Sequence, residues 1–304
     1  MNTVISSRGR VPLKTGLFKG GVLTTLLVFS LPALLVGGSF AALARTPQLL
    51  HTWLWGMVFA YAGAIVPCLL FTIFDVLGTR AKNPGNRYPT ARELRWYGGV
   101  VFTTLTVITV PDFVQLWWAG ATPGSVLALA PGRAPAVIAL ELAFVLIAAD
   151  ALTFAEHWIM HRVPWLWKNV HVVHHSFDHR GASLFSWAGI WVHPIEALIF
   201  LLAMIAAPTL LALSGLYVVH PLSLWLGLFL YVALVVEEHC GFDFAWSPRN
   251  WFPGGLATGA VSHELHHGQA RKNLGFILTI WDQAAGTLAR PRAAKRARAA
   301  RSLP

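Results

Sequence analysis

Histidine is the residue type whose placement in this sequence carries the most chemistry. The chain has 13 His, and twelve of them lie in its second half. Eight form one pair at i, i+4 and two triplets at i, i+3, i+4; these are His157, His161, His171, His174, His175, His263, His266 and His267. Residues at these spacings share one face of a helix. Because neutral imidazole is a common transition-metal ligand, the pattern predicts a metal centre built from convergent helices.

The composition shows what kind of chain must position these histidines. Hydrophobic residues make up 56% of the 304 residues and charged residues only 12%, about half the share of a soluble domain. So little charge cannot cover a soluble surface, and the chain is predicted to be an integral membrane protein. Its two Cys exclude a disulfide framework. A net charge of +10 without basic residues interleaved among aromatics does not indicate nucleic-acid binding.

The apolar runs predict an all-α fold. A helix needs about 20 apolar residues to cross the hydrocarbon core. Six runs meet this length, at residues 22–44, 53–77, 98–118, 135–156, 184–212 and 218–239. The fifth contains Pro208, so we expect it to be kinked or shorter than it looks. The sequence thus predicts a polytopic membrane bundle of about six spans that carries a histidine-rich helical cap.

The basic residues predict which way the bundle faces. Cytoplasmic loops retain Lys and Arg. Of the 23 Lys and Arg, only Arg45 and Arg133 fall in loops on the predicted outer side. Both termini and the histidine-rich cap are therefore predicted to be cytoplasmic. Residues 288–304 form a basic tail, which we expect to be solvated and close to anionic lipid.

This topology separates the remaining histidines. His51 and His220 are predicted to lie across the membrane from the clusters and cannot join them. His193 is predicted about two turns inside the fifth span, and His239 at the inner end of the sixth. Both could reach the clusters as additional ligands. His179, between two charged residues in a loop, is interpreted as a solvated side chain.

Acidic residues inside membrane spans are costly and usually functional. Asp150 precedes His157 by seven residues, two helical turns, and shares its helix face. We expect Asp150 to accept an imidazole N–H and so fix the tautomer of a ligand. Glu237 and Glu238 flank His239 and could do the same or bind metal. Asp150 and Glu238 are the candidate catalytic carboxylates.

Two other functions are compatible with parts of the pattern. Residues 263–267 read His-Glu-Leu-His-His, which contains the zinc metalloprotease signature with Glu264 as general base. A protease site uses three protein ligands and one zinc, and would leave most clustered histidines unexplained. A metal-binding membrane protein without catalysis remains a second alternative. Haem ligation fits worse, because these histidines cluster at helix ends rather than mid-span.

The order of motifs resembles the fatty acid hydroxylase/sterol desaturase superfamily. The resemblance covers residues 135–287, after an N-terminal membrane part at 1–134 and before the tail at 288–304. It includes the three histidine clusters, Asp150, His239 and the sequence His193-Pro194-x-Glu196. Asn273-x-Gly275, Trp281-Asp282 and Gly286-Thr287 complete it.

The resemblance implies a membrane enzyme with two non-haem iron ions, which uses O2 and two electrons on a fatty acyl or sterol-like C–H bond. The implied metal ligands are His157, His161, His171, His174, His175, His193, His239, His263, His266 and His267. Relatives with a fused cytochrome carry His-Pro-Gly-Gly, whereas this chain has His193-Pro194-Ile195 and His220-Pro221-Leu222. Electrons are therefore expected from a separate ferredoxin, or from a b-type cytochrome and its reductase.

The predicted topology can be tested by thiol labelling in intact cells. Single cysteines at Ser125 and Arg180, in a background without Cys68 and Cys240, should respond oppositely to a membrane-impermeant reagent. Position 125 should label from outside and position 180 should not, because the basic loops stay in the cytoplasm. External labelling at position 180 would contradict this topology.

Overall fold

The structure is a computed structural model that describes residues 47–77, 133–177, 185–242, 244, 246–252 and 255–289. The predicted spans at 22–44 and 98–118 and most of the basic tail lie outside these residues. Across the described ranges the regular elements are all helical, and residues Ala257 and Leu278 form an isolated antiparallel bridge. The expected all-α class is confirmed for this part of the chain.

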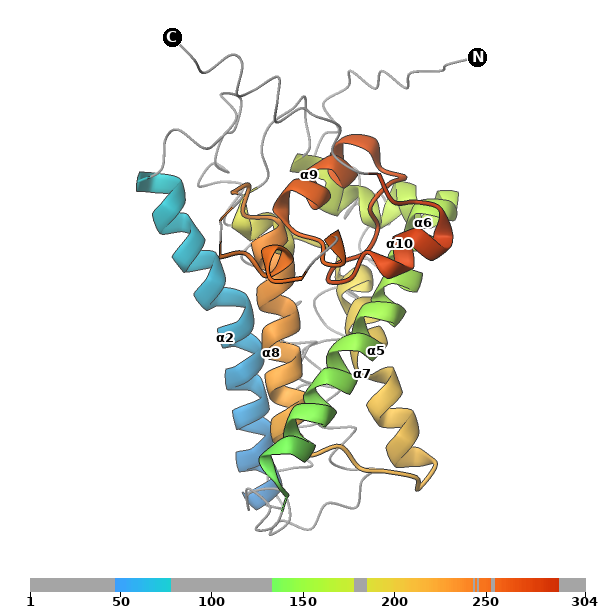
Figure 1. Ribbon diagram of the computed structural model, residues 1–304. Helices are drawn as coiled ribbons and strands as arrows, with labels where there is room; N and C mark the ends of the chain where they lie inside the picture. Colours follow the sequence, from blue (N-terminus) through green and yellow to red (C-terminus); the bar gives the residue numbers. More distant parts are fainter. Residues whose placement is uncertain are drawn as a thin grey trace, which may run out of the picture.

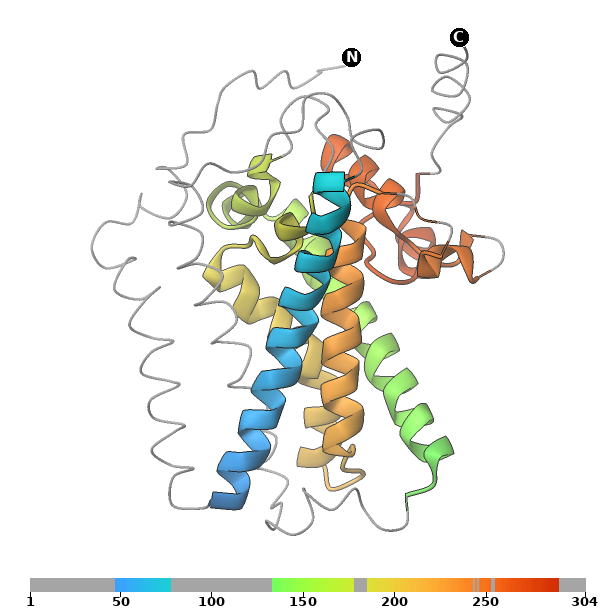
Figure 2. The same cartoon turned by 90° about the vertical axis from the view of Figure 1, so that its left-hand side faces the viewer.

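Four long helices run side by side, and short helices cover their upper end (Figures 1 and 2). The long helices are α2 (Pro47–Leu77), α5 (Pro135–Arg162), α7 (Pro194–Leu213) and α8 (Pro221–Glu238). The short α-helices are α6 (Pro164–Asn169), α9 (Ala260–Gln269) and α10 (Ile280–Ala285). Three 3-10 helices complete the set: η1 (His171–Phe177), η2 (Ser186–Ile190) and η3 (Pro248–Asn250).

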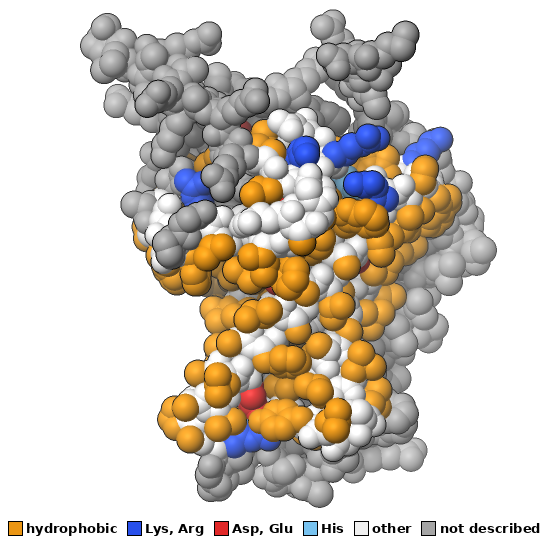
Figure 3. Space-filling model, turned by 45° about the vertical axis from the view of Figure 1, so that its right-hand side comes forward, with side chains coloured by type: hydrophobic (Ala, Val, Ile, Leu, Met, Phe, Trp, Pro, Cys, Tyr) orange, Lys and Arg blue, Asp and Glu red, His pale blue; other side chains and the backbone are white. Residues whose placement is uncertain are grey.

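Three of the described helices, α5, α7 and α8, are long and apolar enough to cross a membrane. Helix α2 contributes a shorter apolar stretch, Tyr61–Phe74. In Figure 3, hydrophobic side chains dominate the lower part of the described surface, and Lys and Arg gather near the upper end. This distribution is that of an integral membrane protein whose bundle lies in lipid below a polar cap.

The fifth predicted span begins later than expected. Residues 186–190 form η2, residues 191–193 are not helical, and α7 starts at Pro194. A proline fits the first helical position but disfavours helical geometry in the residue before it. His193 accordingly has φ −66° and ψ 141° and forms the N-cap of α7. Its predicted place two turns inside the span was wrong. The helix continues through Pro208 to Leu213.

Glycines allow α8 to pack closely against its neighbours. A Cβ on Gly63 of α2 would lie 2.9 Å from the Cα of Phe229, and one on Gly227 would lie 2.5 Å from a methyl of Val145 in α5. Helices in membranes commonly associate through such small residues. The α2, α5 and α8 axes can therefore approach closely.

A buried carboxylate fastens the lower end of the bundle. Glu141 of α5 is 5% exposed and pairs with Arg133. It also accepts hydrogen bonds from the hydroxyls of Tyr217 (2.5 Å) and Ser223 (2.6 Å) and from the backbone N–H of His220 (3.3 Å). A buried charge is tolerated only with such partners. The network ties the α7–α8 turn to α5 at the end of the bundle away from α9 (Figure 1).

Candidate metal centre

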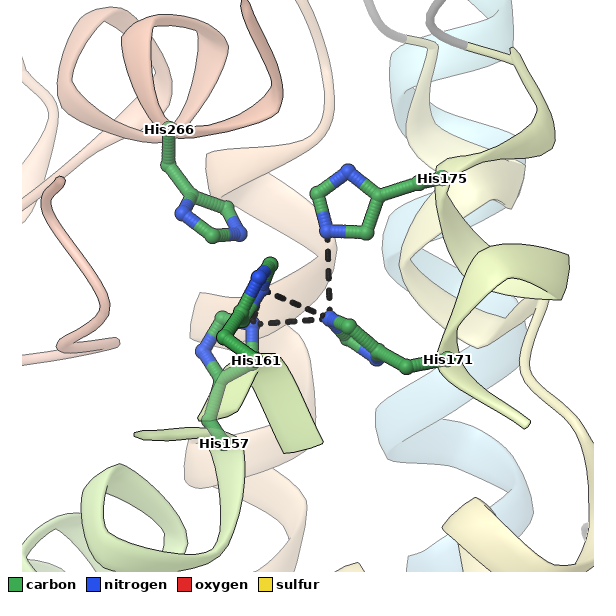
Figure 4. A group of neighbouring side chains, drawn as sticks. All are labelled: His157, His161, His171, His175 and His266. Atoms are coloured by element: carbon green, nitrogen blue, oxygen red, sulfur yellow. Dashed lines mark hydrogen bonds between the residues drawn. The ribbon is translucent and has the colours of Figure 1, made fainter. Parts of the chain in front are cut away.

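Nine histidines converge in two groups under the cap. The first comprises His157, His161, His171, His175 and His266, and the second His174, His239, His263 and His267. Within each group the candidate ligand nitrogens all lie within 4.8 Å of one another. Figure 4 shows the five rings of the first group pointing toward a common centre. All nine side chains are buried except His161, which is partly buried.

Each triplet at i, i+3, i+4 contributes histidines to both groups. His171 and His175 of η1 belong to the first group and His174 to the second. In α9 the order is reversed, because His263 and His267 belong to the second group and His266 to the first. The groups adjoin, since the ring centroids of His175 and His267 are 4.4 Å apart. In each triplet the first and third histidines, which are four residues apart, thus share one group. The middle histidine belongs to the other group.

Hydrogen bonds at Nδ1 set the tautomer of several rings. An Nδ1 that lies beside a backbone carbonyl oxygen must carry the proton, since the carbonyl can only accept. The pairs are His157 with Leu274 (2.8 Å), His174 with Trp191 (3.2 Å), His239 with Val235 (2.6 Å) and His266 with Lys272 (2.9 Å). Nδ1 of His171 lies 2.8 Å from Glu196 Oε1. In these rings, when neutral, Nε2 therefore holds an unprotonated lone pair.

These unprotonated nitrogens face one another. Nε2 of His157 lies 3.1 Å from Nε2 of His171, and Nε2 of His174 lies 3.2 Å from Nε2 of His239. Both rings of the His174–His239 pair donate Nδ1–H to backbone carbonyls, so neither Nε2 can donate and the two lone pairs repel. The same holds for His157 and His171 when Glu196 is ionised. A cation between them removes the repulsion. Ligands about 2.1 Å from one ion and at right angles are about 3.0 Å apart. The donor set therefore fits a metal ion in each group.

Burial keeps these rings neutral. Loss of solvation on burial lowers the pKa of His174 to about 4, from the ordinary value of 6.5. The same cause, strengthened by neighbouring rings that would also be charged, holds the pKa of His171, His239 and His263 well below 6.5. The pKa values of His175, His266 and His267 are lowered in the same way. Neutral imidazole is the form that binds a metal.

Asp150 does not contact an imidazole, contrary to the expectation from its helix face. Its carboxylate accepts from the backbone N–H groups of Ile277 (2.8 Å) and Leu278 (2.9 Å) and from the indole N–H of Trp281 (2.8 Å). Two helical turns span about 10.5 Å, too far for a direct bond to His157. Asp150 instead anchors the chain segment that supplies the carbonyl partner of His157.

Asp282 binds the same segment, residues 274–278, at its beginning. Its carboxylate accepts from the backbone N–H groups of Leu274 (2.8 Å) and Gly275 (2.8 Å) and from the Thr287 hydroxyl (2.6 Å). The Leu274 carbonyl, which receives the Nδ1–H of His157, is therefore held between two buried aspartates. Both act on this candidate ligand through the backbone.

Two glutamates approach imidazoles directly. Glu196, to which the sequence assigned no role, contacts Nδ1 of His171, and Glu238 Oε2 lies 3.7 Å from Nδ1 of His263. Glu238 also accepts from the Thr258 hydroxyl. A carboxylate behind a metal-binding imidazole orients the ring and raises its basicity. An acid in the first turn of a membrane helix was the signal that could have identified Glu196.

His193 lies outside both groups, although the sequence placed it among the candidate ligands. Its Nδ1 accepts from the backbone N–H of Ile195 at 3.1 Å, which caps α7. The two histidines of the protease signature stay together, because His263 and His267 share one group with His174 and His239. A zinc protease uses three protein ligands and keeps one position open for water, whereas this group offers four imidazoles.

An apolar cavity adjoins both histidine groups. The space between its walls, including the part that is open to the surroundings, is about 670 Å³. His157, His171, His174 and His239 form its polar end together with Glu156 and Glu196. The remaining wall is largely hydrophobic and consists of Gly189, Ile190, Val192, Ala197, Phe200, Leu201, Val232, Val235 and Phe276. The cavity can hold an apolar molecule against the rings of both groups.

Comparison with known proteins identifies the family. Residues 142–287 match the fatty acid hydroxylase family. A cholesterol 25-hydroxylase-like protein of Danio rerio is 36% identical over 228 residues, which cover 73% of this chain and 85% of that protein. The chain belongs to the fatty acid hydroxylase/sterol desaturase superfamily. The resemblance stated from the histidine motifs is thereby confirmed.

Other superfamily members are similar over shorter or more divergent alignments. Cholesterol 25-hydroxylase of Rattus norvegicus is 31% identical over 76% of this chain and 74% of its own length. Methylsterol monooxygenase 2-1 of Arabidopsis thaliana is 37% identical over 43% of this chain and 48% of its own length. No solved structure gave a significant match. Membership of the superfamily makes this chain an oxygen-dependent oxidoreductase that oxidises lipid in a membrane.

Replacing Asp150 by Asn should weaken metal binding without abolishing it. The amide would turn an N–H toward backbone donors, loosen residues 274–281 and displace the Leu274 carbonyl from His157. Loss of such indirect support typically costs about 10–100-fold in metal affinity. Chelator competition measures the change. The control is Glu141→Gln, the equivalent acid-to-amide substitution at the other end of the bundle, which should lower thermal stability and leave metal affinity unchanged. Equal metal affinity in the two variants would contradict the role assigned to Asp150.

In the metal-free protein, the stability that depends on His174 should decrease as the pH falls. His174 titrates near 6.5 when unfolded and near 4 when folded, so the unfolded state takes up the proton first. The contribution of His174 to the free energy of unfolding should be constant above about pH 6.5 and decrease from there to about pH 4. Thermal denaturation of the wild type and of His174→Ala, in detergent with chelator, would measure this contribution as the difference between the two. A difference that does not change between pH 6.5 and 4 would contradict a buried, neutral His174.

Proposed function

We propose that this protein is a membrane-bound di-iron oxidoreductase, which uses O2 and electrons from a separate donor to hydroxylate or desaturate a C–H bond of a lipid. One observation carries the proposal. Unprotonated imidazole nitrogens face each other in two adjoining groups beside an apolar cavity. That arrangement requires cations, and it brings an apolar molecule next to them.

The proposed ligands are the nine converging histidines, five for one iron and four for the other. Iron supplies redox chemistry that can break an unactivated C–H bond, which zinc cannot. His193 is left out of the proposed set, because its Nδ1 is engaged by the backbone of α7. Asp150 is proposed as a positioning residue, and Glu196 and Glu238 as the carboxylates that orient His171 and His263.

The protein's own groups prepare this site before a metal arrives. Backbone carbonyls of four residues hold Nδ1–H groups and aim the Nε2 lone pairs inward. Phe200 and Phe276 pack edge to face at 5.4 Å on the cavity wall. Hydrophobic side chains of α7 and α8 keep bulk water away from the reacting carbon, which limits side reactions.

The names of the relatives support a fatty acyl or sterol-like substrate. Similar proteins are named for cholesterol hydroxylation and methylsterol oxidation, and one for decarbonylation of very-long-chain aldehydes. All three are long apolar molecules, as the cavity wall requires. Hydroxylation and desaturation can start from the same hydrogen abstraction, so the proposal includes both.

The electron donor is proposed to dock from the cytoplasm. The excess of Lys and Arg in the loops on the cap side supports that orientation. Every acidic side chain described at the cap, apart from partly buried Glu264, is buried. Among the described residues of the cap, the charged side chains that are not buried are thus Lys or Arg apart from Glu264. Such a surface suits an acidic ferredoxin or a b-type cytochrome with its reductase.

Turnover of iron-loaded protein tests the proposal. Membranes containing the protein, cholesterol or a 4-methylsterol, and a reducing system should incorporate oxygen from 18O2 into lipid. His161→Ala and His239→Ala each remove one donor from a different group and should each abolish product. His220→Ala, at the far end of the bundle, should retain product. Equal product under argon, or in protein loaded only with zinc, would refute the proposal. Peptide cleavage by the wild type that is lost in Glu264→Gln would favour the protease instead.

A further inference from the structure

Two buried carboxyl groups in the cavity wall are incompletely hydrogen bonded. Glu156 of α5 is 9% exposed, and its Oε1 has no hydrogen-bond partner among the described residues. Glu196 of α7 is 6% exposed; its Oε1 contacts His171, and its Oε2 has no such partner either. Both residues line the same cavity. Two carboxyl oxygens without a partner among the described residues therefore belong to the wall of one largely apolar cavity.

Buried polar atoms without partners are rare, because each gives up hydration without replacing it. The other polar groups of the cavity wall are the imidazoles of His157, His171, His174 and His239. In these rings the Nδ1–H groups are already used and the Nε2 atoms are proposed to bind iron. The described part of the wall offers no hydrogen bond to either of these oxygens. A molecule inside the cavity can supply the missing partner.

The chemistry of the wall limits what that donor can be. An ammonium group brings three N–H donors, whereas two carboxyl oxygens of the described wall lack a partner, so one N–H would face hydrophobic side chains. A hydroxyl brings one donor, which a single carboxyl oxygen satisfies. An apolar lipid with a hydroxyl therefore matches both parts of the wall.

The position of the glutamates locates this hydroxyl along the lipid. Glu156 directly precedes His157, and Glu196 contacts His171; both histidines belong to the first group. A hydroxyl bound here lies at the metal end of the cavity, close to the carbon that reacts. A lipid whose only hydroxyl is remote from the oxidised carbon would leave both glutamates unpartnered.

We propose that Glu156, with Glu196 beside it, is a specificity-determining residue that binds a hydroxyl on a carbon adjacent or next-adjacent to the oxidised one. The inference rests on the proposed oxygenase function and narrows its substrate class. A sterol oxidised in its ring system beside the ring hydroxyl meets this requirement. A sterol oxidised at the end of its side chain does not.

The position of the new oxygen tests the inference first. Membranes with the wild-type protein, a reducing system and a total lipid extract are incubated under 18O2, and labelled products are located by mass spectrometry. Label adjacent or next-adjacent to an existing hydroxyl is expected. Label remote from every hydroxyl would overturn the inference while confirming the oxygenase. Absence of any oxygen-dependent product would refute the proposed function, and this inference with it.

Substitution of Glu156 tests the residue itself, using the lipid identified in that way and its methyl ether, which cannot donate. Wild type should prefer the free hydroxyl by about tenfold in kcat/KM, the typical value of one such hydrogen bond. Glu156→Leu should bring the ratio close to one, and Glu156→Gln, which keeps an acceptor oxygen, should retain part of it. Iron content should be unchanged in both variants. An unchanged preference in Glu156→Leu would overturn the assignment, as would loss of iron, which would make Glu156 a ligand.

Discussion

Mutual repulsion among buried imidazole lone pairs is the constraint on which the rest of this structure depends. Unprotonated Nε2 atoms 3.2 Å apart, as in His174 and His239, cannot coexist in a neutral, dry site unless a cation lies among them. The backbone carbonyls of Leu274, Trp191, Val235 and Lys272 create this situation by taking up the Nδ1–H groups. Metal binding should therefore add directly to the stability of the cap, since the unfolded chain has no such preformed site.

The membrane bundle serves to hold the elements that carry these rings. Close contacts at Gly63 and Gly227 let α8 approach α2 and α5, and the Glu141 network fastens their lower end. Asp150 and Asp282 then fix the chain between α9 and α10, which carries the carbonyl partner of His157. Stability and ligand geometry are thus coupled, because the same buried acids serve both.

The sequence indicated which histidines lie together but not which partners they contact. Spacing identified eight histidines, because a face shared at i, i+3 and i+4 is a local property of a helix. The division of each triplet between two groups depends on how η1 and α9 face each other, which spacing does not encode. The reach of Asp150 was misjudged because a helix face was considered without the rise along its axis. His193 was placed inside a span because the hydrophobic run hid the effect of Pro194 on the helix start. The unpartnered oxygen of Glu156 follows only from three-dimensional packing.

Anomalous X-ray scattering from crystals of the protein purified under iron-replete conditions tests the central claim most directly. Data collected on either side of the iron absorption edge would locate iron without reference to activity. Two iron peaks are expected, one among His157, His161, His171, His175 and His266 and the other among His174, His239, His263 and His267. A single peak, or density at either site that appears only at the zinc edge, would contradict a di-iron centre.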